Sequence, residues 1–236
     1  MIQKTIGILG GMGPLATADL FRKITLLTEA DGDNEHIRVY IDSNSHIPDR
    51  TAAILRGGED PVPEMTSALR HLEDCGADCI IMPCNTAHYF LPQLQPLTKI
   101  PFLSMLEATA KTCALRYPGK TAGILATRGT LETGLYTRAL EAQGVPSIMP
   151  DEAGRDALMA AIYDGVKGGR DLEELRAPVE DLLGRMCDQG ADYFILGCTE
   201  LPIVQQELAL DGQFIDPTAE LAKAAITFCG GTIKER

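Results

Sequence analysis

The second half of this chain repeats the first half, and each repeat ends in a cysteine. The pattern D-x-G-A-D-x-x-I-x-x-C covers residues 74–84 and returns 114 residues later, at residues 188–198. Upstream, T-x-G-I-L at residues 5–9 leads to a glycine, a leucine, a threonine and an arginine, and the same series returns 116 residues later. A duplication in the same order predicts two similar lobes related by a pseudo-twofold axis. We then expect the two cysteines, Cys84 and Cys198, to face one cleft.

Short apolar segments rich in β-forming residues alternate with longer helical patterns, which is typical of an α/β protein with parallel sheets. The expected strands are residues 5–9, 38–41, 79–82, 102–104, 122–125, 147–149, 193–196 and 214–215. The expected helices are residues 16–29, 63–75, 108–117, 131–143, 172–189 and 219–229. The predicted fold class is α/β, with two pseudo-symmetric, doubly wound lobes of mostly parallel sheet and an interlobe cleft.

A weaker repeat assigns the end of the chain to the first lobe. Residues 102–111 have an echo 112 residues later, so the last strand and helix complete a half that begins elsewhere. We therefore expect a first α/β lobe at residues 1–100 plus 214–236 and a second at residues 101–213. A chain of 236 residues is long enough for two small domains.

Charge and hydropathy restrict the class of partner. The net charge of −12 argues against a nucleic-acid backbone or an anionic membrane surface as a partner. No apolar run approaches the roughly 20 residues of a membrane span, and no signal-peptide cleavage site follows the apolar residues 6–9. We expect a cytoplasmic protein that acts on a small molecule. An anionic substrate would need local positive charge in the site.

The chain has seven cysteines, an odd number that is typical of reduced thiols in the cytoplasm. The spacing of Cys75, Cys79 and Cys84 matches no familiar zinc pattern, so no metal is expected. Five cysteines lie within helical or strand patterns and are interpreted as small buried hydrophobic residues: Cys75, Cys79, Cys113, Cys187 and Cys229.

Cys84 and Cys198 differ because each ends an apolar strand and opens a polar turn toward a helix. Backbone N–H groups at a helix start favour the thiolate over the thiol. With Asn85, Thr86 and Thr199 beside them, the same N–H groups can hold a carboxylate. Inversion of a stereocentre needs one group that removes a proton from one face and a similar group that supplies a proton from the other. A thiolate and a thiol meet this need and exchange roles in each turnover.

Four short motifs together point to a known family. They are G-G-M-G-P at residues 10–14, P-D-R-T at residues 48–51, P-C-N-T-A-H at residues 83–88 and G-C-T-E-L at residues 197–201. In this order they resemble the cofactor-independent aspartate/glutamate racemases, from residue 5 to about residue 225. The two cysteine motifs are more similar to those of the aspartate racemase branch.

The resemblance implies that the protein interconverts L- and D-aspartate, or a related acidic amino acid, without a cofactor and as a homodimer. It implies that Cys84 and Cys198 are the two acid/base groups. It also implies a set of substrate-binding residues: Asn85, Thr86 and Thr199 for the α-carboxylate, Arg50 and Lys167 for the side-chain carboxylate, Thr127 and Thr130 as further donors, and Met12 on the pocket wall.

Other enzymes on the same scaffold are alternatives. A hydantoin or broad-range amino-acid racemase fits the same motifs, and so does a decarboxylase or isomerase with one thiol, although the second cysteine argues against a one-thiol enzyme. A non-catalytic carboxylate-binding protein is an alternative from another class. Exchange of the substrate α-proton with solvent deuterium would separate a catalyst from a binding protein.

Two cofactor-dependent classes explain the sequence less well. Gly11-x-Gly13-x-x-Ala16, with Asp42 after the next strand, matches a dinucleotide-binding pattern. A nicotinamide enzyme would leave the paired cysteines unexplained, and no lysine has the context of a pyridoxal Schiff base. His88 is open between a catalytic role and that of a helix-turn residue that orients the Cys84 loop. Glu200 and Asp42 are candidates for positioning neighbouring groups, and the formation of an inactivating disulfide between the two thiols stays open.

Overall fold

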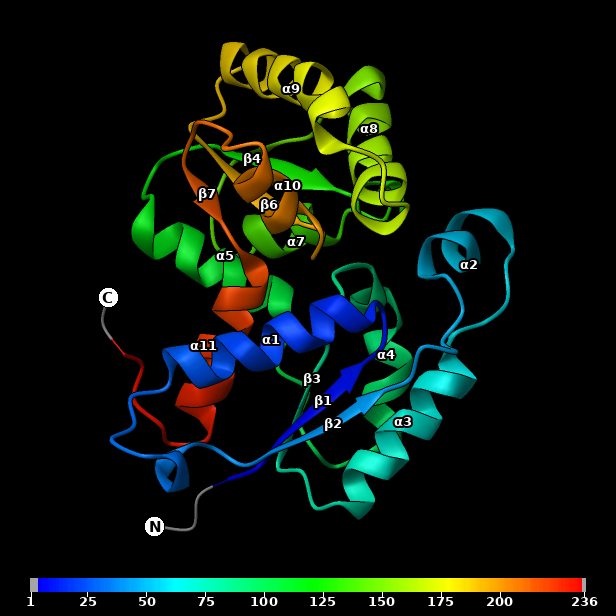
Figure 1. Ribbon diagram of the computed structural model, residues 1–236, viewed down its shortest axis with the longest axis vertical. Coiled ribbons are helices and arrows are strands. Elements are labelled where there is room, and N and C mark those ends of the chain that lie inside the picture. The colour runs from blue at the N-terminus through cyan, green and yellow to red at the C-terminus, as the bar shows by residue number, and fades with distance from the viewer. Residues whose placement is uncertain (1–3, 235–236) are drawn as a thin grey trace. The chain divides into compact units, whose positions relative to one another are not determined.

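The computed structural model describes residues 4–234 and shows two parallel β-sheets with helices packed against them (Figure 1). The chain divides into two compact units, residues 4–108 with 218–234 and residues 109–217, and each unit contains one sheet. The predicted α/β class with parallel sheets is confirmed. The lobe boundaries expected from the sequence stay a prediction.

The sheet of the first unit has three parallel strands in the order β2-β1-β3. The strands are β1 (Ile6–Gly10), β2 (Val39–Ser43) and β3 (Cys79–Ile81). The helices are α1 (Pro14–Leu27), α2 (Arg50–Arg56), α3 (Val62–Asp74), α4 (Leu91–Leu94) and α11 (Pro217–Phe228), with the 3-10 helices η1 (Asp33–Glu35), η2 (Thr86–Phe90) and η3 (Gln95–Leu97). A further helix, α5 (Met105–Arg116), begins in this unit and continues into the second.

Strand β1 is the centre of the first unit, and all five of its residues are buried. Successive side chains of a strand point to opposite faces of a sheet. Accordingly, Ile6 and Ile8 pack in one cluster with residues of α1 and α11, whereas Leu9 packs in another with residues of α3 and α4 (Figure 1). Because helices cover both faces, the carboxyl edge of the sheet is where a ligand site is expected.

The sheet of the second unit has four parallel strands in the order β5-β4-β6-β7. The strands are β4 (Ala122–Ala126), β5 (Ser147–Ile148), β6 (Tyr193–Gly197) and β7 (Phe214–Ile215). The helices are α6 (Arg128–Glu132), α7 (Leu135–Glu141), α8 (Glu152–Met159), α9 (Arg176–Asp188) and α10 (Leu201–Glu207), with the π-helix η4 (Ala160–Lys167) and the 3-10 helix η5 (Leu172–Leu175). Leu125 and Leu196 pack against α8, η4 and α9 in the core of this unit.

The internal repeat forms the same backbone contacts in both units. In the first, the carboxylate of Asp78 accepts a hydrogen bond from the Thr5 N–H at 2.7 Å, and the Asp78 N–H donates to the Thr5 carbonyl at 2.8 Å. In the second, Asp192 makes the same two bonds with Thr121, at 2.8 and 2.9 Å. In each unit the repeated aspartate therefore joins the starts of two strands that are neighbours in the sheet, β1 and β3 or β4 and β6. This shared contact explains why the residue recurs.

Two predicted elements differ from the structure. The strand expected at residues 102–104 is wrong, because Phe102 makes only an isolated parallel bridge to Ile80 before α5 begins at Met105. The helix expected at residues 131–143 is divided between α6 and α7. Gly134 interrupts it with a left-handed backbone (φ 63°), which glycine adopts without steric cost.

The long helical segment formed by α8 and η4 was not predicted from the sequence. Its apolar residues Leu158, Ala161 and Ile162 are buried in the core of the second unit. In a π-helix the hydrogen bonds span five residues instead of four. Gly154 and Gly165 lie inside the segment, and glycine disfavours a helix, so helix propensity gives only a weak signal there.

Candidate active site

The two cysteines of the repeat lie at the carboxyl edges of the two sheets. Cys84 is the third residue after β3 and is 7% exposed, and it belongs to the same buried cluster as Met12. Cys198 directly follows β6 and is 8% exposed. Ala126 and Gly197 are paired in register, so Thr127 and Cys198 leave neighbouring strands at the same edge. The residues after the strands are thus placed where the sequence predicted them within each unit.

A buried threonine orders the glycine-rich loop after β1. The Thr17 hydroxyl accepts a hydrogen bond from the Gly11 N–H at 2.9 Å and donates to the Gly13 carbonyl at 3.0 Å. In the second unit Thr133 donates to the Gly129 carbonyl at 2.6 Å, four residues earlier, as Thr17 does. From the sequence these threonines were known only as repeated residues. Their constant four-residue spacing from a glycine could have indicated that each one orders the glycine loop.

Arg50, predicted to bind a substrate carboxylate, holds the loop that contains Met12. Its Nη1 donates to the carbonyls of Ile47 at 3.1 Å and Pro48 at 2.8 Å, and Nη2 donates to the Met12 carbonyl at 3.2 Å. The Nε group is buried and makes no hydrogen bond with the described residues. A guanidinium has five N–H donors, so these three bonds leave donors for a ligand. Its contact with substrate stays a prediction.

His88 holds the backbone of Cys84. Its Nδ1 lies 2.9 Å from the Cys84 carbonyl oxygen, and its Nε2 accepts a hydrogen bond from the Met105 N–H at 3.0 Å. Because the Met105 N–H can only donate, the ring proton lies on Nδ1 and is donated to Cys84. Burial lowers the pKa of His88 to about 4. The ring is therefore neutral near pH 7, and its two nitrogens are engaged with backbone and not with the thiol.

Replacement of His88 by asparagine is expected to lower stability in a pH-dependent way. The folded pKa of about 4 lies below the ordinary value of 6.5, so between these values the unfolded chain binds more protons. The contribution of the neutral His88 ring to the free energy of unfolding is complete above pH 6.5 and is smaller by about 2–3 kcal/mol at about pH 4.5. The variant should be less stable at pH 7 by about 1–3 kcal/mol, and the difference should shrink at about pH 4.5. Urea unfolding at both pH values measures this, and an equal difference at both would contradict the assignment.

The second cysteine is paired with an acidic residue. The Cys198 thiol donates to Glu200 Oε2 at 2.9 Å, and the Thr199 hydroxyl donates to the same oxygen at 3.2 Å. Burial and the Glu200 carboxylate raise the pKa of Cys198 well above its usual value, and Lys167 offsets part of this effect. The expectation that a helix start favours the thiolate is wrong for Cys198, because burial and a carboxylate outweigh the N–H groups.

Lys167 is the last residue of η4, and it reaches the same carboxylate. Its Nζ lies 3.5 Å from Glu200 Oε1, on the side opposite the oxygen that accepts from Cys198. The Lys167 side chain is one-third exposed, whereas that of Glu200 is 10% exposed. The predicted substrate-binding residues Lys167 and Thr199 therefore meet at Glu200, which the sequence offered only as a candidate for positioning neighbouring groups.

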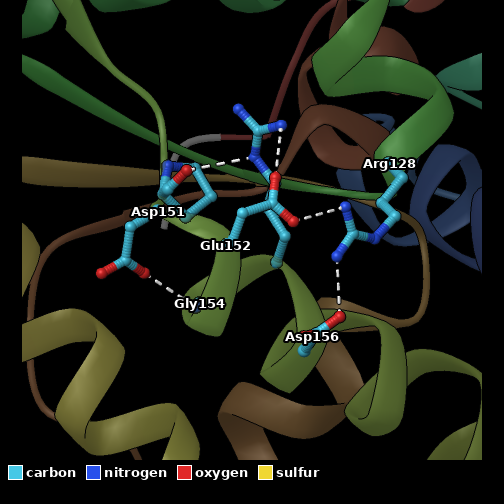
Figure 2. Close-up of polar contacts among 7 residues, drawn as sticks. Arg128, Asp151, Glu152, Gly154 and Asp156 are labelled. Carbon is cyan, nitrogen blue, oxygen red and sulfur yellow. Dashed lines mark hydrogen bonds and ion pairs between the residues drawn. The ribbon is translucent and has the colours of Figure 1, made fainter.

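An ion-pair cluster ties the loop after β4 to the helix that leads into η4. Arg128 binds Glu152 at 2.9 Å and Asp156 at 2.7 Å (Figure 2). Both carboxylates are on α8, whose first turn is capped by Asp151 through the Gly154 N–H at 2.8 Å. The acidic side chains are largely exposed, so each pair adds little stability. The contacts nevertheless orient the loop of Thr127 and Thr130 relative to α8.

Thr127 and Thr130, predicted as substrate donors, are buried and bonded to each other. The Thr127 hydroxyl donates to the Thr130 hydroxyl at 3.2 Å and accepts from the Thr130 N–H at 3.4 Å. Thr127 is thus the N-cap of α6. In the first unit Asn85 and Thr86 are also buried, and the Asn85 carbonyl accepts from the His88 N–H at 3.1 Å.

Asp42, part of the dinucleotide-binding pattern in the sequence, lies in β2 and is paired with His71 of α3 at 2.8 Å. Over residues 4–234, no group of three or more His, Cys, Asp or Glu side chains is arranged to hold a metal ion. Within the same residues, no helix has both the length and the apolar character needed to cross a bilayer.

Comparison with known proteins agrees with the four sequence motifs. The sequence model of the family described as Asp/Glu/Hydantoin racemase matches residues 9–225. The chain is 28% identical to the broad specificity amino-acid racemase RacX of Bacillus subtilis (strain 168), over 94% of this chain and 96% of that protein. This family match covers most of the chain.

Solved structures show the same fold. Aspartate racemase from Picrophilus torridus has a TM-score of 0.83 and 32% identity, with 98% of this chain and 96% of that chain covered. Glutamate racemase from Francisella tularensis, solved with D-glutamate, has a TM-score of 0.68 and 21% identity, with 97% and 81% covered. The second likeness supports the fold alone. The resemblance predicted from the sequence is confirmed: the chain belongs to the Asp/Glu/hydantoin racemase family and is an amino-acid racemase, an isomerase.

Proposed function

We propose that this racemase interconverts L- and D-aspartate, or a related acidic amino acid, without a cofactor, by proton transfer at Cα between substrate and two thiols. The observation that carries the proposal is the matched pair Cys84 and Cys198, each buried at the carboxyl edge of its own parallel sheet. The likeness to Picrophilus aspartate racemase supports the choice of substrate.

The proposed reaction has two proton transfers. The thiolate of one cysteine removes the α-proton: an S–H bond forms, the Cα–H bond breaks, and the electron pair stays on the substrate as a carbanion. The thiol of the other cysteine then gives its proton to the opposite face, and its S–H bond breaks. Since Cys198 is held as a thiol in the free protein, we propose that Cys198 is the donor and Cys84 the base in the first turnover.

The carbanion requires stabilisation, because an α-proton beside a carboxylate is weakly acidic. We propose that Asn85, Thr86 and Thr199 donate hydrogen bonds to the α-carboxylate, where negative charge increases in the transition state. Arg50 and Lys167 are proposed to bind the side-chain carboxylate, which a protein with a net charge of −12 would otherwise repel. Met12 and the pair Thr127 and Thr130 are proposed to shape the rest of the pocket.

A broad-range amino-acid racemase is a second candidate function. The similarity to RacX, which extends over nearly the whole length of both proteins, favours it. In that case the protein would also act on neutral amino acids, whose side chains offer no carboxylate to Arg50 or Lys167. A panel of L-amino acids in a chiral assay distinguishes the two candidates.

We also propose a cytoplasmic homodimer. The seven free cysteines suit a reducing compartment. Apolar side chains are exposed on α1 and on the edge strand β2, among them Leu15, Phe21 and Ile41, and their burial against a second copy would favour association. Sedimentation as a monomer at micromolar concentration would contradict the dimer.

Proton NMR tests the proposed reaction directly. We expect purified, reduced protein in D₂O, without pyridoxal phosphate, to remove the α-proton signal of L-aspartate and to produce D-aspartate in a chiral assay. Exchange without inversion would mean that only one thiol acts. Neither exchange nor inversion, with aspartate and then with glutamate, would contradict the proposed substrate class.

A further inference from the structure

The internal symmetry fails two residues after each cysteine. Residue 86, which corresponds to residue 200 by the 114-residue offset, is a threonine, whereas residue 200 is a glutamate. Thr86 carries no charge, but Glu200 brings a carboxylate to 2.9 Å from the Cys198 sulfur. The repeat predicts two equivalent thiols, and this difference makes their electrostatic surroundings unequal.

Resting on the proposed function, we infer that Glu200 is a positioning residue that holds the proton on Cys198 through the Sγ–H···Oε2 hydrogen bond and so sets Cys198 as the proton donor of the free enzyme. The carboxylate is itself held by two further groups. Thr199 donates to the oxygen that accepts from Cys198, and Lys167 lies 3.5 Å from the other oxygen. With two partners on a nearly buried side chain, Glu200 has little freedom to leave the thiol.

The groups that face Cys198 come from three elements. Glu200 follows β6, and Lys167 ends η4. Tyr136 of α7 lies against Gly197, the residue before Cys198: a Cβ placed on Gly197 would be 2.9 Å from the tyrosine ring. Burial raises the pKa of Tyr136 well above its usual value, so this residue stays neutral. Lys167 is the one cation of the three, and its ammonium contacts the far oxygen of Glu200.

The pairing of Cys198 with Glu200 has a defined consequence for the reaction. When Cys198 gives its proton to the carbanion, a thiolate remains beside the Glu200 carboxylate, and the two like charges repel. Repulsion favours return of a proton to Cys198. Either Cys84 releases its proton to solvent while Cys198 takes one up, or Cys198 removes the α-proton of a molecule of the opposite enantiomer and Cys84 gives its proton to the other face. The form with both cysteines deprotonated, which has no donor, is then disfavoured, so the activity should extend to higher pH than it would without Glu200.

The Glu200→Gln variant tests the inference, because it keeps the shape of the side chain and removes its charge. Loss of a like charge at this distance should lower the pH midpoint of Cys198 alkylation by iodoacetamide by about one unit or more. Alkylation is followed at each cysteine by peptide mass spectrometry without substrate, so Cys84 in the same sample is the internal reference and should not shift. The alkaline limb of kcat/KM for aspartate should move to lower pH by a similar amount.

Glu207→Gln, an exposed substitution on α10 with the same change in net charge, is the matched control and should leave both profiles unchanged. An unchanged Cys198 midpoint in a folded Glu200→Gln protein would overturn the inference. A shifted midpoint with an unchanged kcat/KM profile would also overturn it, because the held proton would then not be used in the reaction. If the Cys198 midpoint shifts in Glu200→Gln but the wild-type protein racemises no acidic amino acid, the proposed function fails and the thiol–carboxylate pairing stands.

Discussion

Alanine in place of either Cys84 or Cys198 is expected to lower the rate of racemisation by about 10²–10⁴-fold, the range that a positioned acid/base group contributes. Each thiol is proposed to serve one face of Cα, so neither can replace the other. Chiral chromatography measures the loss of inversion. Proton NMR in D₂O adds a sharper readout: each variant should keep α-proton exchange for one enantiomer at most, and the favoured enantiomer should differ between the two variants.

Two other cysteines provide matched controls for this experiment. Cys75 in the first unit and Cys187 in the second are exposed, so the expectation that they are buried is wrong, and neither occupies a position that the repeat retains. Their alanine variants should racemise at the wild-type rate, which separates loss of a specific thiol from loss of any thiol. Near-wild-type turnover in either the Cys84 or the Cys198 variant would eliminate the two-base assignment.

A large loss of stability is expected for Gly11→Ala. Gly11 has φ +90°, and a Cβ built at this position would lie 2.2 Å from the Asn44 carbonyl oxygen. A methyl group there meets backbone atoms that cannot move away as a flexible side chain can. We expect destabilisation on the order of 3 kcal/mol or more, from the strained backbone and the steric overlap together. Urea denaturation followed by circular dichroism measures this difference.

Gly13→Ala is the control for Gly11→Ala, since it lies two residues further along the same loop. Its backbone is extended (φ −107°), and a Cβ would meet no atom within 4 Å. Gly13 is the N-cap of α1, so its replacement by alanine should lower the free energy of unfolding by about 1 kcal/mol at most. Equal stability losses in the two variants would show that close contact with Asn44 is not what requires glycine at residue 11.

Much of the fold could be predicted because its strands follow from local sequence patterns, and the same patterns occur in both halves of the chain. Strand β1 has a continuous apolar run, and its counterpart β4 has the same one, so the two predictions supported each other. The repeated Asp78 and Asp192 make identical contacts with the strand starts. The segment of α8 and η4 escaped prediction because Gly154 and Gly165 lower its helix propensity.

In the candidate site, too, local motifs identified some features, whereas others depend on tertiary contacts. The motifs P-C-N-T-A-H and G-C-T-E-L identified both cysteines and the polar residues beside them, since ligand sites in parallel sheets lie just beyond the strand ends. The motif left the role of His88 open between catalysis and orientation of the Cys84 loop. Its partner Met105 is 17 residues away, and the neutral ring results from burial between backbone groups of separate elements.

Local sequence patterns were sufficient to determine the parallel strands, the turns at their carboxyl ends and the presence of one thiol at a matched turn in each half. They could not determine the protonation of Cys198. That property depends on the burial of the sulfur, on the direction of the Glu200 side chain and on Lys167, which the chain brings from 31 residues upstream. The electrostatic free energy of a buried group sums over every charge that folding places near it. The helix start after the cysteine was one contribution, and the folded environment outweighed it.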